Sequence, residues 1–222
     1  MIDKDYEMPQ TRRPGRHEEG ARTRERILEA ASILIAGQGY AATSIAQISK
    51  RAKVNAASIY WAFENKEGLL TAVMERSANS FFDGLSQRVT GDPWQMLADL
   101  ADDFAAGPEF LRLLLVLSLE RRDGDPLVLE AARRIRAKAI DGLALSYESV
   151  IDLENQFARR RVCRELAGFT LMLLDGVFVA GQIESSTIDL ERSFQTLSLG
   201  VRATAERLVL EAMNTTPATS SH

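Results

Sequence analysis

The sequence predicts an all-α protein with a small amino-terminal domain and a larger helical carboxy-terminal domain. Apolar residues recur at helical spacing along most of the chain, glycine and proline gather at a few breaks, and neither a strand pattern nor an internal repeat is found. With 222 residues, 45% of them hydrophobic, the chain is long enough to build two such cores.

The first predicted helix carries a single apolar stripe. Its members lie at positions i, i+3, i+4, i+7 and i+8, and they are Ile27, Ala30, Ala31, Leu34 and Ile35. The segment Gly37-Gln38-Gly39 is expected to end this helix, because glycine tolerates the positive φ of a C-cap. Residues 1–20 before it are expected to form a flexible basic arm.

Two short helices joined by a tight turn are expected over residues 44–63. Thr43 is expected to cap the first helix through its hydroxyl, and Asn55 is expected to cap the second, whose Ile59 and Phe63 face the core. Such a pair can place its second helix in the major groove of DNA while the first braces it against the backbone. Periodicity alone leaves an ordinary helical hairpin as the alternative. A further helix is expected after Asn65.

Three breaks divide the rest of the chain. They are Gly91-Asp92-Pro93, Gly107-Pro108 and Gly124-Asp125-Pro126, where each proline suits the start of a following helix. Helices are therefore expected over residues 94–106, 109–122, 127–154, 164–184 and 189–214. The expected domains are 21–80 and 81–214, and a disordered tail is expected over 215–222.

Charge is distributed unevenly between the two ends of the chain. The whole protein has a net charge of −4, but residues 9–66 hold ten Lys and Arg against five Glu, and residues 67–222 hold sixteen Lys and Arg against twenty-three acids. A basic head on an acidic body favours phosphate contact at one end. Arg22, Arg24 and Arg26 could also reach DNA phosphates.

The motif residues resemble the amino-terminal domain of the tetracycline-repressor-like (TetR) family of bacterial regulators. The resemblance rests on Thr23-Arg24-x-x-Ile27-Leu28, Gly39-Tyr40-x-x-Thr43-Ser44-Ile45, Ile48-x-x-x-Ala52-x-Val54 and Ile59-Tyr60-x-x-Phe63-x-x-Lys66-x-x-Leu69-Leu70. Beyond Ser80 only the layout is similar. The resemblance implies a homodimer that binds a palindromic operator in double-stranded DNA and whose larger domain binds an effector or another protein.

The residues expected to contact DNA lie in and around the second short helix. They are Ser44, Gln47, Lys53, Asn55, Ala56, Ala57, Ser58, Tyr60, Trp61 and Lys66. Alanine can touch a thymine methyl but makes no bidentate hydrogen bond, so base readout depends on the polar members. The resemblance makes Tyr60 and Lys66 backbone contacts, and core packing is an equal alternative for Trp61. Lys53 stands where the family usually has glycine.

An effector pocket in the carboxy-terminal domain would be lined by apolar and aromatic residues with a few polar groups. The candidates are Trp94, Phe104, Phe110, Leu114, Leu117, Tyr147, Phe169, Met172, Asp175 and Phe178. Plain core packing is the alternative for each of them. Asp175 is either hydrogen-bonded within the fold or a polar anchor for an unknown small-molecule effector. A body without a cavity would instead indicate a protein partner.

A homodimer interface is expected on the last two long helices. The residues expected to form it are Ile183, Leu190, Phe194, Leu197, Val201 and Leu208. Symmetric partners bury the same patch on both sides, and two heads then reach half-sites about one helical turn of DNA apart.

Other classes find little support in the composition. The only histidines, His17 and His222, lie in expected tails, so no Ser–His or Cys–His pair is predicted and a helical enzyme is the weaker alternative. Neither a metal site nor a cofactor is expected, and the single Cys163 suits a reducing cytoplasm. Residues 166–183 reach the lower length of a membrane span, but Asp175 within them favours a buried helix and no membrane.

Overall fold

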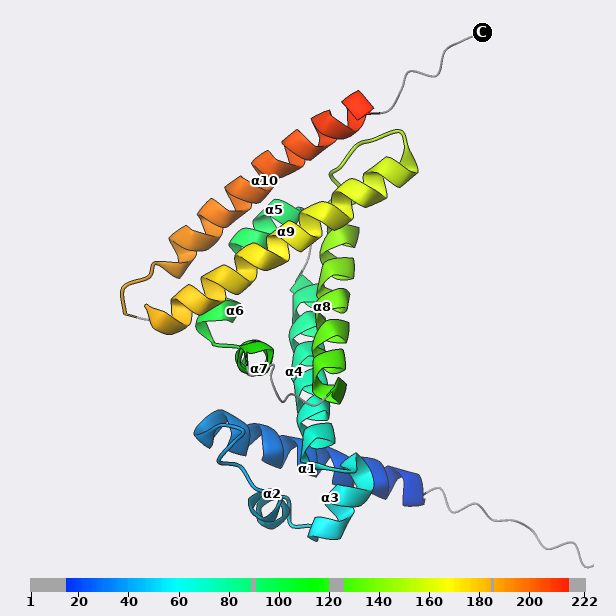
Figure 1. The fold of residues 1–222 in the computed structure, drawn as a ribbon, viewed down its shortest axis with the longest axis vertical. Coiled ribbons are helices and arrows are strands. Elements are labelled where there is room, and N and C mark those ends of the chain that lie inside the picture. Colours follow the sequence, from blue (N-terminus) through cyan, green and yellow to red (C-terminus); the bar gives the residue numbers. More distant parts are fainter. Residues whose placement is uncertain (1–14, 89–90, 120–125, 185, 216–222) are drawn as a thin grey trace, which may run out of the picture. The chain divides into compact units, whose positions relative to one another are not determined.

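The computed structural model describes residues 15–88, 91–119, 126–184 and 186–215 (Figure 1). Every regular element among these residues is a helix, so the predicted all-α class is confirmed. The chain divides into two compact units, Met1–Val73 and Met74–His222. The division lies within a helix and falls earlier than the boundary expected after Ser80.

The first unit holds three helices and the start of a fourth, and the second unit holds the others. In chain order they are α1 (Gly15–Gln38), α2 (Ile45–Ala52), α3 (Ala56–Phe63), α4 (Lys66–Arg88), α5 (Pro93–Ala98), α6 (Ala101–Ala105), α7 (Glu109–Leu119), α8 (Pro126–Tyr147), α9 (Gln156–Ile183) and α10 (Leu190–Thr215). α4 is continuous across the division between the units.

The core of the first unit joins α1, α2, α3 and the start of α4. Its buried residues are Ile27, Ala30, Ala31, Ile35, Ile48, Ala52, Ile59, Phe63, Leu69 and Leu70. Their spacing on each helix is the helical periodicity found in the sequence, so these helices share one small apolar core.

The helix starts differ from the expectation in two places. α1 begins at Gly15 rather than after Gly20, because one glycine inside a helix costs only about 1 kcal/mol and good helix formers surround it. Thr43 does not cap α2: it is buried, and its hydroxyl donates to the Gly39 carbonyl (2.8 Å). Ser44 is the N-cap instead, and it forms a capping box with Gln47.

Several boundaries in the second unit also differ. The helix expected over 94–106 is divided into α5 and α6, since a bond from Leu100 N–H to the Leu97 carbonyl (3.4 Å) tightens the chain between them. α8 ends at Tyr147, and α9 begins at Gln156, eight residues before the expected start, because Asn155 Oδ1 accepts hydrogen bonds from the amides of Phe157 (2.9 Å) and Ala158 (3.1 Å).

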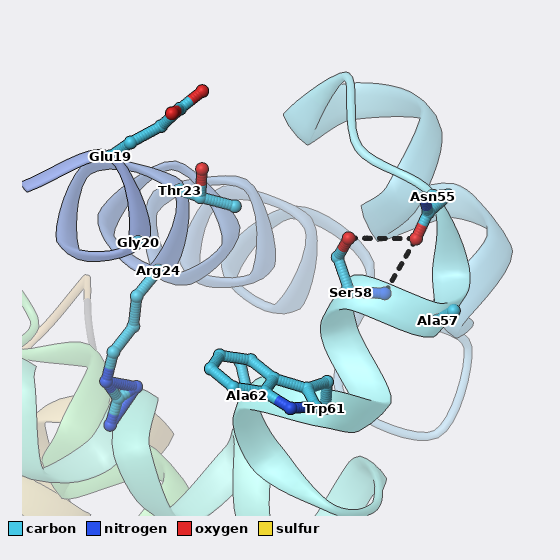
Figure 2. A pocket seen from close by; sticks show the side chains of 9 residues that line it. All are labelled: Glu19, Gly20, Thr23, Arg24, Asn55, Ala57, Ser58, Trp61 and Ala62. Atoms are coloured by element: carbon cyan, nitrogen blue, oxygen red, sulfur yellow. Dashed lines mark hydrogen bonds between the residues drawn. The ribbon is translucent and has the colours of Figure 1, made fainter. Parts of the chain in front are cut away.

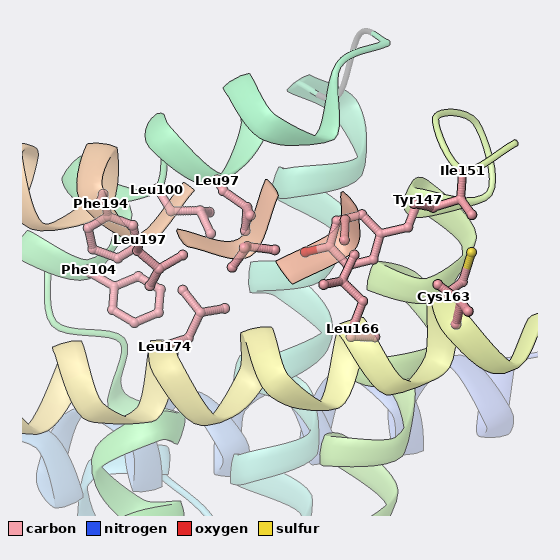
Figure 3. Close-up of a cluster of buried hydrophobic side chains, with 14 of the residues drawn as sticks. Leu97, Leu100, Phe104, Tyr147, Ile151, Cys163, Leu166, Leu174, Phe194 and Leu197 are labelled. Carbon is pink, nitrogen blue, oxygen red and sulfur yellow. The ribbon is translucent and has the colours of Figure 1, made fainter. Parts of the chain in front are cut away.

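The core of the second unit lies between α5, α6, α8, α9 and α10 (Figure 3). At one end the ring of Trp94 stacks on that of Tyr147, with centroids 5.5 Å apart, and at the other the Phe104 ring meets Phe194 edge-on at 4.9 Å. Leu166 and Leu174 of α9 point into the space between them. The length and apolar composition of α9 would also suffice for a membrane crossing, and 33% of its most apolar stretch is buried within the protein.

One polar network is buried in this core. Thr170 Oγ1 donates to the Leu166 carbonyl (2.8 Å), so the Tyr147 hydroxyl, also 2.8 Å away, donates to Thr170. Burial raises the pKa of Tyr147 to about 12. The Tyr147 hydroxyl therefore has Thr170 as its hydrogen-bond acceptor, whereas Thr170 also bonds to the Leu166 carbonyl.

This asymmetry predicts unequal effects of two substitutions on the free energy of unfolding, measured by urea denaturation. Thr170→Val leaves the buried phenol without an acceptor and is expected to cost about 1–3 kcal/mol, whereas Tyr147→Phe leaves Thr170 bonded to Leu166 and is expected to cost about 0.5–1.5 kcal/mol. Thr196→Val, at an exposed threonine with a similar bond to its own helix, is the control. If Tyr147→Phe and Thr170→Val lowered the free energy of unfolding equally, the assignment of the Tyr147 hydroxyl as the donor would be contradicted.

Candidate nucleic-acid interface

One face of α3 is buried and the opposite face is exposed. Ile59 is 0% exposed and Phe63 is 6% exposed, whereas Tyr60 and Trp61 are 51% and 88% exposed. The exposure of Trp61 rules out the core packing that was its alternative role. Together with the exposed first-turn alanines, Ala56 and Ala57, these side chains form a surface of small residues followed by two aromatic rings with polar tips.

The polar candidates near the start of α2 and α3 also serve as caps. Asn55 Oδ1 accepts from the amide (2.7 Å) and the hydroxyl (2.8 Å) of Ser58. Gln47 Oε1 accepts from the amide of Ser44 (2.8 Å) and from Gln38 Nε2 (3.3 Å). The caps use the amide oxygens of Asn55 and Gln47, so any readout of bases by these two residues falls to their amide nitrogens.

Lys53 ends α2 in the left-handed region, with φ 54° and ψ 47°. This conformation costs a non-glycine residue on the order of 1 kcal/mol, and lysine occupies it with its side chain exposed. The short link through Val54 and Asn55 leads directly into α3. The unusual backbone therefore places a cation in the turn between the two helices of the motif.

The link between α3 and α4 is equally tight. Glu64 has φ 65° and ψ −52°, and the Asn65 amide donates to the Phe63 carbonyl (2.7 Å), which makes a three-residue γ-turn. Asn65 Oδ1 then accepts from the amide of Gly68 (2.6 Å), as predicted for a cap of this helix. A Cβ atom on Gly68 would collide with the Phe63 carbonyl oxygen, so the position requires glycine.

Lys66 is the first residue of α4 and is half-buried. Its Nζ donates to the Tyr40 carbonyl (3.0 Å) and lies 4.2 Å from the centroid of the Tyr40 ring. The ammonium group is thus held by the loop between α1 and α2. It lies in the same unit as the exposed face of α3, at the start of the next helix.

A hollow of about 530 Å³ lies between α1 and α3 (Figure 2). Its α3 wall carries Ser58, Trp61 and Ala62, and its α1 wall carries residues such as Thr23 and Arg24. The Arg24 guanidinium lies 4.5 Å from the centroid of the Phe63 ring. Thr23 was not among the predicted contact residues. The sequence feature that could have pointed to it is its spacing of one helical turn from the buried Ile27.

Residues 27–73 match the family described as bacterial regulatory proteins, tetR family. The HTH-type transcriptional repressor NicS of Pseudomonas putida is 32% identical over 143 residues, which cover 61% of this chain and 65% of that protein. The HTH-type transcriptional regulator AcrR of Shigella flexneri is 28% identical over 125 residues, which cover 53% of this chain and 58% of that protein. The segment 27–73 is therefore a domain of the TetR-family type. The chain spans less than two thirds of the length of either relative.

The likeness in fold is not limited to the matched segment. A Saccharomonospora viridis protein, whose crystal structure is a complex with choline, superposes with a TM-score of 0.63 at 19% identity, covering 82% of this chain and 96% of that one. At this identity the likeness concerns the fold alone.

The effector-pocket candidates lie in several places in the second unit. Phe104, Phe110, Leu114, Tyr147 and Phe178 are buried, and Trp94 and Phe169 are half-buried. Leu117 lies outside the side chains that the structure describes. Met172 was expected inside, but it is 62% exposed on the outer side of α9. The Asp175 carboxylate accepts from Arg136 (2.8 Å), so it is paired within the fold.

The predicted dimer residues need correction. Phe194 and Val201 are 0% exposed and Leu197 is 7% exposed, because they fill the chain's own core against α5 and α9. Leu190 and Leu208 are half-buried against that same core. Of the predicted set, Ile183 is exposed, at 76%. The exposed large apolar residues on α9 and α10 are Phe157, Met172, Val179, Ile183, Leu199, Leu210 and Met213.

Among the described residues, no three His, Cys, Asp or Glu side chains come together as metal ligands would.

The left-handed conformation of Lys53 predicts that two substitutions there differ in their effect on stability. Lys53→Gly is expected to raise the free energy of unfolding by up to about 1 kcal/mol, because glycine adopts this conformation without strain, whereas Lys53→Ala keeps the strain. Both variants lose the cation, and both are expected to weaken DNA binding to a similar extent. Urea denaturation and a DNA titration separate the two effects, and equal stabilities of the two variants would contradict the assigned strain.

Proposed function

We propose that this protein is a DNA-binding transcriptional regulator that represses by occupying a palindromic operator. The observation that supports this most directly is the exposed face of α3, which carries Tyr60 and Trp61 in the second helix of a TetR-family motif. Adjacent exposed aromatic side chains form an apolar patch of the kind that marks interaction sites. The NicS relative is named a repressor, and repression requires only that the operator be occupied.

The proposed DNA contacts divide into two kinds. Ala56 and Ala57 permit close approach to the major groove and contact with thymine methyl groups, while Ser58 and the amide of Asn55 can hydrogen-bond to base edges. Tyr60, Trp61, Lys53 and Lys66 contact phosphates, which fixes the register of the protein on the duplex. Ser44 and Gln47 lie at the start of the bracing helix and are assigned to the groove edge.

We further propose that two copies associate through α9 and α10. Met172, Val179 and Ile183 follow one another at helical spacing along α9, and Leu199, Leu210 and Met213 do so along α10. These two helices pack on each other, so the two exposed stripes belong to the same unit. A symmetric pair of such surfaces would bury both stripes and present two heads to the half-sites of a palindrome.

An effector that binds the second unit is proposed to release the DNA. α4 runs unbroken from Lys66 into the second unit, so a shift of its body end changes the position of its DNA end. By linkage, an effector that weakens DNA binding is itself bound more weakly in the presence of DNA. Asp175 already holds Arg136, so a cationic effector would have to displace that guanidinium. A protein that docks on the second unit is the alternative controller.

Selection of bound duplexes from a random pool, followed by footprinting, tests this function. The expected result is a palindrome with half-sites one helical turn apart or a multiple of that distance. The absence of any enriched sequence, with retention that is uniform across the pool, would contradict a specific regulator.

Lys66→Ala is expected to weaken binding to the selected operator and to unrelated duplex by similar factors. One phosphate contact is lost, so the slope of log affinity against log salt should fall in magnitude by about one. Fluorescence anisotropy at several salt concentrations measures the slope. Tyr60→Ala is expected to weaken binding as well, and circular dichroism serves to check that both variants keep their helices. An unchanged slope for Lys66→Ala would remove Lys66 from the phosphate contacts.

Leu210→Glu is expected to convert the dimer to a monomer, because it places a carboxylate in the centre of the proposed apolar stripe. Sedimentation at micromolar concentration measures the mass. Leu145→Glu is the matched control, since Leu145 is 70% exposed but belongs to α8. Dissociation by the control, or a dimer that withstands Leu210→Glu, would place the interface elsewhere.

A further inference from the structure

Lys66 and Tyr40 are joined by two contacts although they lie 26 residues apart in the chain. The Lys66 Nζ donates to the Tyr40 carbonyl at 3.0 Å, and it lies 4.2 Å from the centroid of the Tyr40 ring. The Tyr40 hydroxyl in turn donates to Glu67 Oε1 (3.3 Å), the residue that follows Lys66. One tyrosine thus contacts the first two residues of α4 with its carbonyl, its ring and its hydroxyl.

The loop that carries Tyr40 is itself held in place. Gly39 has φ 82°, and its amide donates to the Ile35 carbonyl (2.8 Å), which ends α1. The Thr43 amide donates to the Tyr40 carbonyl (3.1 Å), and the Thr43 hydroxyl donates to the Gly39 carbonyl (2.8 Å). The Tyr40 carbonyl therefore accepts two hydrogen bonds, one from its own loop and one from Lys66, which matches its two lone pairs.

An ammonium group has three N–H donors on a flexible stem. The Tyr40 carbonyl takes one donor, and the face of the ring attracts the positive charge. Held in this way, the group has two donors left for the oxygens of a phosphate. A lysine that is fixed before DNA arrives loses less conformational freedom on binding than one that moves freely in solvent.

We propose that Tyr40 is a positioning residue for DNA binding, which acts by holding the Lys66 ammonium where the backbone phosphate is to be bound. This inference rests on the proposed function, because it requires that Lys66 contact a phosphate. It assigns to the loop between α1 and α2 a part in DNA affinity that requires no contact of Tyr40 with the DNA.

A double-mutant cycle on the full-length protein tests this role, with fluorescence anisotropy on the selected operator at several salt concentrations. Tyr40→Leu removes the ring and the hydroxyl but keeps the carbonyl, and it is expected to weaken binding about twofold to fivefold, as befits a half-exposed cation–π contact. Tyr40→Phe keeps the ring and should bind as the wild type does. In the Lys66→Ala background, Tyr40→Leu should have no further effect.

Thermal unfolding separates positioning from loss of fold. If Tyr40→Leu melts well below the wild type, Tyr40→Met supplies a longer apolar side chain without an aromatic face, and the same cycle is measured with it. The positioning role would be overturned if Tyr40→Leu weakened DNA binding equally in the wild-type and Lys66→Ala backgrounds. It would also be overturned if Tyr40→Phe bound DNA more weakly than the wild type. That result would leave the proposed function standing, because DNA binding by the wild type and by Lys66→Ala tests that function separately. The absence of a selected operator would overturn both.

Discussion

The chain reverses between α3 and α4 within two residues, and the position of the candidate interface depends on this reversal. The Phe63 carbonyl oxygen lies over the first turn of α4, so close to Gly68 that no side chain fits there. Glu64 turns the chain with a positive φ, and the Asn65 side chain caps the next helix. With so little slack, the end of α3 and the start of α4 move together, and Lys66 keeps a fixed position relative to Trp61.

Strain gathers at the two turns that flank α3. Lys53 and Glu64 are the non-glycine residues with positive φ among the described positions, and they lie in the short links before and after this helix. A positive φ costs each of them on the order of 1 kcal/mol, and such costs persist where the surrounding structure enforces the conformation. Here the small core around Ile59 supplies that support. The fold therefore keeps two strained turns that fix the orientation of α3, although an unstrained backbone would be more stable.

Much of the first unit could be predicted because short-range signals agree there. The stripe around Ile27, the cap at Asn55 and the buried Ile59 and Phe63 follow from helical periodicity and cap chemistry. The choice between Thr43 and Ser44 could not be made in advance, since both are hydroxyl residues at a helix start. Thr43 is buried in the folded protein, so Ser44 is the residue that caps α2. Burial is a property of the fold and is not visible in the local sequence.

The second unit was harder to predict because its long helices are apolar on more than one side. On α10, Phe194 and Val201 follow the same helical periodicity as Leu199 and Leu210, yet the first pair is buried and the second is exposed. Sequence spacing identifies both stripes and does not tell which one faces the chain's own core. The start of α9 was missed for a different reason. Asn155 is a good cap, but the arginine run Arg159–Arg161 that follows it interrupts the apolar periodicity from which helices are predicted.

The two tryptophans of the chain lie in different units and in opposite surroundings. The indole of Trp61 is 88% exposed on α3, whereas that of Trp94 is half-buried and stacked on Tyr147. A water-exposed indole emits at longer wavelength and is reached by aqueous quenchers, whereas a shielded one is not. The protein thus carries a separate intrinsic fluorophore in each unit, so light emission can distinguish an event at the candidate interface from one inside the helical body.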